Sequence, residues 1–135
     1  MNHWLLKTEP SVYSYSDLER DKQTVWDGVR NPYAIRHIRE AKIGDLAFIY
    51  HTGEEKQVIG IAEIISEPDN DPESEDPRLW VFEVKAKRKL KKPVTLAEIK
   101  ADKRFKGSTL VRAPRLSVQA MPKELWDAIL ELSGG

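Results

Sequence analysis

The sequence predicts an α+β fold built on a mixed, strongly curved sheet or small barrel. Segments with strand periodicity and segments with helix periodicity follow one another in the order β–α–α–β–β–β–α–β–α. Residues 46–50 form a nearly continuous apolar run, which is typical of a strand buried on both faces. The length of 135 residues suits one compact domain, so we expect a single domain over residues 1–135.

The composition limits the chemistry that is open to this chain. It contains 40% hydrophobic and 33% charged residues, as ordinary globular proteins do. The absence of cysteine excludes disulfides, thiol catalysis and cysteine-based zinc sites. The histidines are scattered along the sequence, and we expect neither a metal site nor another cofactor.

The expected location follows from two further absences in the sequence. No apolar run approaches the length that spans a membrane, and residues 1–7 lack the apolar core of a signal peptide. We therefore expect an intracellular protein with no membrane partner, which is cytoplasmic, or nuclear if the source is eukaryotic.

Charge is balanced overall but unevenly distributed, with 22 basic and 22 acidic residues. Residues 67–76 contain six acidic side chains and no basic one, whereas residues 83–115 contain twelve basic side chains and three acidic ones. This asymmetry is compatible with a basic face that meets phosphate, with Lys87 and Arg88 as candidate contacts. A solvated strand face explains it equally well.

The first elements are predicted by alternation and capping signals. Residues 3–8 alternate in hydrophobicity and indicate a strand, which Pro10 closes. Ser16 followed by Glu19 forms a capping box and predicts a short helix there.

A turn and a second helix follow. Asp27-Gly28 is a strong turn signal, Asn31 is a good N-cap, and Pro32 suits the first helical position. We therefore expect a helix over about residues 32–41, with Ala34, Ile35, Ile38 and Ala41 on its apolar face.

The middle of the chain is predicted to be rich in strands. Residues 42–45 form a turn before the central strand 46–50, and residues 58–66 form a further strand in which Gly60 marks a bulge or a close approach. Residues 68–77 contain three prolines and no large apolar side chain, which predicts a mobile loop.

The last third is predicted to contain two strands and two helices. Residues 79–89 indicate a long strand that Pro93 ends, and Thr95 with Glu98 forms a capping box for a short helix. Residues 116–119 indicate a last strand, and a C-terminal helix opens at Pro122. We expect Trp80 and Trp126 in the core, because each lies beside other apolar residues.

One stretch combines features of a binding site. Trp26 precedes the predicted start of the helix at Pro32, and the positive end of a helix attracts phosphate. An indole offers a flat surface on which a base can stack. The alternative is a core tryptophan beside a surface turn.

Five motifs together resemble the EVE domain family of the PUA-like superfamily, which also holds YTH domains. They are residues 4–10 (WLLKTEP), 26–31 (WDGVRN), 44–52, 60–63 (GIAE) and 116–119 (LSVQ). The resemblance implies a PUA-like curved mixed sheet or pseudo-barrel with flanking helices and a pocket at one end. It also implies that a modified nucleic-acid base is flipped from its stack into that pocket.

The resemblance assigns roles to residues at matching positions. Lys7 and Arg30 are implied to hold phosphates, as positioning contacts do. Thr52 stands where many members carry serine, and residues 32–34 depart from the common Tyr-Gln-Ala. The implied base pocket consists of Trp26, Asn31, Tyr50, His51, Thr52 and Ser117.

These residue types suit a flipped base, because its lost stacking and pairing must be recovered. Trp26 is the best stacking candidate and Tyr50 the second. The hydroxyls and amide of the implied pocket, with a neutral His51, supply donors and acceptors for the base edge. The alternatives are that Tyr50 is a core ring and that His51 is a surface residue at a strand end.

We therefore expect a non-enzymatic, monomeric module that binds modified DNA or RNA. One alternative is a small enzyme acting on a nucleotide or modified base, using Lys7, Glu9, Tyr50 and His51 for acid–base chemistry. The sequence offers this enzyme no nucleophile elbow, phosphate-binding glycine loop or carboxylate cluster. A second alternative is a protein-interaction module that uses the acidic loop.

Overall fold

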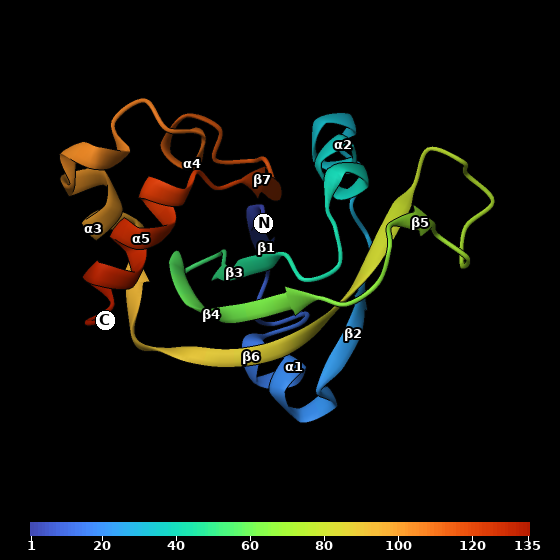
Figure 1. The fold of residues 1–135 in the computed structure, drawn as a ribbon, viewed down its shortest axis with the longest axis horizontal. Helices are drawn as coiled ribbons and strands as arrows, with labels where there is room; N and C mark the ends of the chain where they lie inside the picture. The colour runs from blue at the N-terminus through green and yellow to red at the C-terminus, as the bar shows by residue number, and fades with distance from the viewer.

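The computed structural model describes residues 1–135 and contains a curled mixed sheet with helices around it (Figure 1). Six strands lie in the order β2–β6–β4–β3–β1–β7, and β5 pairs with β6 beside them. The strands are β1 (His3–Thr8), β2 (Gln23–Trp26), β3 (Leu46–His51), β4 (Gln57–Ile64), β5 (Asp69–Asn70), β6 (Trp80–Thr95) and β7 (Val118–Ala120). The predicted α+β class with a curved mixed sheet is confirmed.

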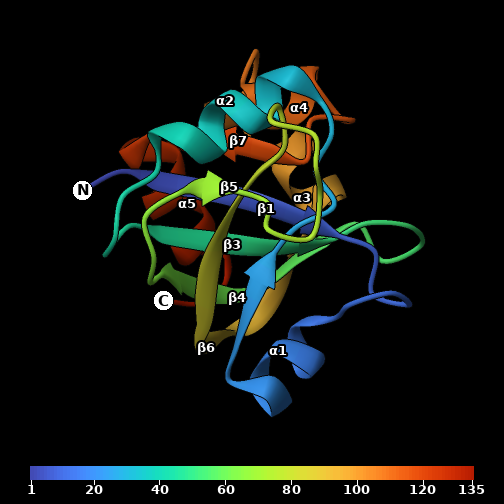
Figure 2. The same ribbon diagram turned by 90° about the vertical axis from the view of Figure 1, so that its right-hand side faces the viewer.

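The sheet is mixed, and it bends where β4 pairs with β6. β1 and β3 are parallel, whereas β3–β4, β4–β6, β2–β6 and β1–β7 are antiparallel. Figure 2 shows β6 crossing steeply over β1 and β3, so that β2 and the end of β1 come to the same side of the molecule. Register shifts between β4 and β6 accompany this bend, as β-bulges do.

Helices cover both faces of the sheet. They are α1 (Tyr15–Asp21), α2 (Pro32–Glu40), α3 (Leu96–Ala101), the 3₁₀ helix η1 (Lys103–Phe105), α4 (Thr109–Arg112) and α5 (Lys123–Leu132). Trp4 and Leu6 pack with the apolar residues of α1 and α2, whereas Leu5 and Phe48 pack with those of α3 and α5. Burial on both faces explains the continuous apolar run of β3. None of the helices is long and apolar enough to cross a membrane.

Three predictions based on local signals are confirmed. β1 has the predicted bounds, and α2 begins at Pro32 with Asn31 as its N-cap. The Asn31 Oδ1 atom accepts hydrogen bonds from the amides of Tyr33 (2.8 Å) and Ala34 (3.2 Å). The capping box of α3 forms between Thr95 and Glu98, as expected.

The first helix begins earlier than predicted. Its capping box joins Ser14 and Asp17, not Ser16 and Glu19: the Asp17 amide donates to Ser14 Oγ at 3.1 Å, and the Ser14 amide donates to Asp17 Oδ2 at 2.8 Å. The earlier start places Tyr15 in the first turn, where its ring is fully buried. Tertiary packing therefore selects between two local capping signals.

The prediction that Pro93 ends the long strand is wrong, since β6 continues to Thr95. Pairing with β4 is interrupted between Lys89, opposite Gly60, and Val94, opposite Val58. Pro93 lies in this unpaired stretch, where its missing N–H group costs no ladder hydrogen bond. Gly60 fulfils both expectations, because it flanks a register shift and an added Cβ would lie 2.6 Å from the Tyr15 ring.

Smaller differences concern short elements and two tryptophans. The strand β2 and the helices η1 and α4 were not predicted, and β5 lies within the predicted loop 68–77. Trp126 is in the core, stacked on Phe48 with ring centroids 3.8 Å apart. Trp80 is only partly buried: it packs against the core on one side and lies 4.6 Å below the Arg39 guanidinium, so its expected core placement holds in part.

Candidate nucleic-acid interface

The largest cavity described here lies where β1 and β2 end, and we call it the Trp26 cavity. Its volume is about 650 Å³, within the usual range for small-molecule sites. It is lined by the segments 7–9, 12–13 and 24–29, together with Ser117 before β7. Three segments that are distant in sequence therefore converge at this end of the sheet.

Trp26 is both a core residue and a wall of this cavity. Trp26 is 7% exposed, and it pairs with Phe82 in the ladder between β2 and β6. Gly28 follows with a φ of +77°, which L side chains rarely adopt, and turns the chain from β2 toward α2. The two interpretations of Trp26 are thus compatible, since the residue is anchored in the core and still lines the cavity.

Lys7 and Ser117 bring polar groups to the Trp26 cavity. The Lys7 ammonium donates a hydrogen bond to the Pro114 carbonyl (2.7 Å) and lies 5.3 Å from the centre of the Tyr50 ring. Burial lowers the pKa of Lys7. The Ser117 carbonyl accepts from the Lys7 amide at 2.9 Å, while its hydroxyl has no partner within the chain. Glu9 and Asp27 also line the cavity.

Tyr50 and Thr52 line a neighbouring cavity of about 250 Å³, which we call the Tyr50 cavity. Tyr50 is 4% exposed, and burial raises the pKa of its hydroxyl. The Thr52 hydroxyl lies 3.4 Å from the Thr8 carbonyl and from Glu9 Oε2. Lys56 and Lys100 line this cavity together with Lys7, Gly53, Leu96, Leu110 and Pro114.

Asn31 lies in a third cavity, of about 480 Å³, which we call the Arg115 cavity. Its side-chain oxygen is used by the helix cap, which leaves the amide NH₂ group as a donor. The structure therefore separates Asn31 from Trp26. The cavity is lined by Asn31, Tyr33, His37, Thr109, Arg112, Ala113, Pro114, Arg115 and Leu116.

The three cavities are contiguous. Lys7 lines both the Trp26 and the Tyr50 cavity, and Pro114 lines both the Tyr50 and the Arg115 cavity. Leu116 in the Arg115 cavity is followed directly by Ser117 in the Trp26 cavity. The hydrogen bond from Lys7 to Pro114 therefore lies where the three cavities meet.

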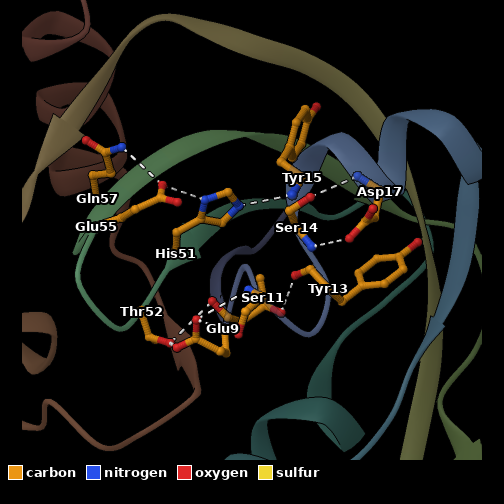
Figure 3. Close-up of polar contacts among 11 residues, drawn as sticks. Glu9, Ser11, Tyr13, Ser14, Tyr15, Asp17, His51, Thr52, Glu55 and Gln57 are labelled. Atoms are coloured by element: carbon orange, nitrogen blue, oxygen red, sulfur yellow. Dashed lines mark hydrogen bonds and ion pairs between the residues drawn. The ribbon is translucent and has the colours of Figure 1, made fainter.

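His51 does not reach any of these cavities, which corrects its expected role at a base edge. It is 5% exposed, its Nε2 atom accepts from the Tyr15 amide at 3.0 Å, and its Nδ1 atom lies 2.9 Å from Glu55 Oε1 (Figure 3). Because a backbone amide can only donate, the ring proton is on Nδ1 and points to Glu55. Both nitrogens are thus occupied by structural contacts.

The predicted phosphate contacts are dispersed. Arg30 lines a separate cavity of about 420 Å³ with Arg39, Arg78 and Trp80. Lys87 is paired with Glu63 at 2.9 Å, and neither Lys87 nor Arg88 lines a described cavity. The structure therefore does not bring Arg30, Lys87 and Arg88 to the cavity that Trp26 lines.

The cavity residues that the sequence analysis did not assign individually include Tyr33, Lys56, Lys100, Arg112 and Arg115, of which the last three lie in the basic stretch 83–115. Arg112 and Arg115 flank Pro114 in a stretch for which no element was predicted, and Tyr33 follows the Asn-Pro helix start. Tyr33 is 65% exposed, and an exposed aromatic ring can indicate a binding surface. This exposure is known only once the fold is known.

Comparison with known proteins identifies relatives along the whole chain. Thymocyte nuclear protein 1 of Homo sapiens is 32% identical over 97% of this chain and 73% of its own length. The crystal structure of human THYN1 protein in complex with DNA containing 5-methylcytosine has a TM-score of 0.91 and 30% identity, covering 100% of this chain and 99% of that one.

Two further structures place the fold. An NMR structure of a Rhodopseudomonas palustris protein has a TM-score of 0.94 and 39% identity, covering 99% of this chain and 94% of that one. The ASCH structure from Zymomonas mobilis has a TM-score of 0.63 and 16% identity, covering 96% and 94%, which supports the PUA-like fold alone. The EVE domain profile matches residues 2–132, and this chain belongs to the EVE domain family.

Proposed function

We propose that this chain is a binding module that takes a modified nucleic-acid base, flipped out of its stack, into the Trp26 cavity. The observation that carries the proposal is the convergence there of an indole, an unpartnered hydroxyl and a cation. The human relative with the same fold along its length was crystallised with DNA containing 5-methylcytosine. We propose a ligand of the same class, DNA with a modified base, for this chain.

The side chains at the cavity match the needs of a flipped base. Stacking on an aromatic face is worth roughly 1–3 kcal/mol per base, which offsets the few kcal/mol that flipping costs. The Ser117 hydroxyl can donate or accept, and Lys7 can donate to a carbonyl oxygen of the base. Asp27 can accept from an exocyclic amine such as that of cytosine.

We also propose that binding leaves the nucleic acid chemically unchanged. The imidazole that an acid–base mechanism would use, His51, is occupied by Tyr15 and Glu55 away from the cavity. Nucleoside analysis after prolonged incubation of a 5-methylcytosine oligonucleotide with the protein should return the input composition. A new nucleoside that appears in proportion to protein concentration would favour the enzyme instead.

The central test fills the cavity without changing charge. Ser117→Leu places a large apolar side chain at the wall of the cavity, whereas Ser16→Leu adds the same side chain on the exposed face of α1. Affinity is measured for two duplexes that differ only in 5-methylcytosine against cytosine. We expect wild type and Ser16→Leu to prefer the modified duplex and Ser117→Leu to lose the preference. A preference that survives Ser117→Leu in a folded protein would remove the Trp26 cavity as the site.

A further inference from the structure

We infer that two basic clusters on either side of Lys7 hold the phosphate backbone of the nucleic acid that flanks the flipped base. The first cluster is Lys56 and Lys100 in the Tyr50 cavity, and the second is Arg112 and Arg115 in the Arg115 cavity. We call these four residues the cavity cations. The inference rests on the proposed function, because it takes the Trp26 cavity as the place of the base.

The position of the clusters gives the first argument. Both of their cavities border the Trp26 cavity, one through Lys7 and the other through the step from Leu116 to Ser117. A nucleotide whose base enters the central cavity is joined by phosphates on both sides. Those phosphates must leave across the neighbouring surface, which the cavity cations line.

Charge gives the second argument. The only acidic residues that line the three cavities, Glu9 and Asp27, line the central one, and the Glu9 carboxylate lies 3.4 Å from the Thr52 hydroxyl at the border with the Tyr50 cavity. Acceptors are useful at a base edge but repel phosphate. The distribution therefore matches a base in the middle and phosphates at the sides.

The cavity cations are also free, which gives the third argument. All four are exposed, and none forms an ion pair within the chain. On β6, by contrast, Lys87 is paired with Glu63 at 2.9 Å and Lys89 with Glu19 at 3.8 Å. Unpaired cations can neutralise phosphates without first breaking an internal contact.

Tyr33 extends the same surface beside the arginines. It is 65% exposed, lines the Arg115 cavity and has the Arg36 guanidinium 5.8 Å from its ring centre. An exposed ring next to two phosphate-binding side chains can stack on the base that neighbours the flipped one. Tyr33 therefore contributes a contact that does not depend on charge.

Salt dependence separates these contributions. Affinity for a duplex with one 5-methylcytosine is measured over a range of salt concentrations for Lys56→Gln, Lys100→Gln, Arg112→Gln and Arg115→Gln. Each lost phosphate contact should lower the slope of log affinity against log salt by about 0.9. Lys87→Gln and Arg88→Gln are the matched controls and should leave the slope unchanged. Tyr33→Ala should weaken binding about tenfold at every salt concentration.

Three outcomes would overturn the inference, and one would affect only the proposed function. Equal slopes for the cavity variants and wild type would exclude phosphate binding by the cavity cations. A lower slope for the β6 controls alone would exclude it as well. A wild-type protein that binds modified and unmodified duplexes equally would contradict the proposed function, while the slopes would still locate the backbone. A protein that binds neither duplex would overturn both.

Discussion

Two regions of this molecule contain similar residue types but differ in how their polar groups are used. Around Tyr15, the ring hydroxyl donates to the Ile61 carbonyl at 2.7 Å, and the backbone amide donates to His51. At the Trp26 cavity, the Ser117 hydroxyl lacks a partner, and the adjoining arginines form no ion pair. We call the first the closed region and the second the open region. The two regions thus differ in how many of their hydrogen-bonding and charged groups are left without a partner, and the proposed binding surface is the one with free groups.

Trp26 shares a core cluster with Tyr15 and also lines the Trp26 cavity, so its replacement gives the largest expected effect. Trp26→Ala removes a side chain that packs with Phe82 and the surrounding core, and about 4 kcal/mol of unfolding free energy should be lost. Urea denaturation measures the loss. Trp26→Phe retains a ring and should lose less. If the midpoint of urea unfolding is the same for Trp26→Ala and wild type, Trp26 does not contribute to the core.

The closed region should tolerate no added atom at Gly60. Gly60→Ala places a Cβ 2.6 Å from the Tyr15 ring, which is fully buried and held by its hydrogen bond to Ile61. We expect a loss of about 3 kcal/mol, at the upper end for overpacking. Gly107→Ala is the control: its φ is +77° but its surroundings are open, so only about 1 kcal/mol of backbone strain is expected. Equal losses for the two variants would show that the Tyr15 ring can move aside.

His51→Leu tests whether this histidine is structural. The leucine leaves the buried Tyr15 amide without an acceptor, which should cost about 2 kcal/mol of stability. The preference for a modified base, measured on the folded variant, should not change. A stable variant that loses the preference for the modified base would show that His51 takes part in binding.

The smallest expected effect concerns His37, whose Nδ1 atom is buried without a partner. Burial lowers the pKa of His37 in the folded protein below its ordinary value of 6.5. As the pH falls through 6.5, His37 takes up a proton more readily in the unfolded chain than in the folded protein. The folded state therefore loses stability. The melting temperature should therefore fall less in His37→Leu than in wild type between about pH 7.5 and 5.5. An equal fall in both proteins would assign the pH dependence to other groups.

The fold was predictable where the signal is local. The Asn31 and Thr95 caps act through hydrogen bonds within three residues, and the apolar run of β3 reports burial on both faces. β2 was missed because its four residues acquire a regular structure only by pairing with β6. The extension of β6 past Pro93 was missed because it depends on where β4 stops pairing.

The candidate site was predictable only in part for a related reason. The family motifs named Lys7, Trp26 and Ser117, which do line one cavity. They also named His51, whose partners Tyr15 and Glu55 come from other segments and cannot be read from its own motif. Arg112 and Arg115 were missed because their positions depend on how the segment around Pro114 packs beside Lys7.

The pairing of β1 with β7 has a consequence for how the chain acquires its site. It joins Trp4 to Ala120 and Leu6 to Val118, so β1 completes its ladder with a segment that is synthesised long after it. Contacts between distant segments form slowly because a long loop must close first. The wall that Ser117 gives to the Trp26 cavity therefore forms only after residue 117 has been synthesised, and a nascent chain has the indole before it has the pocket.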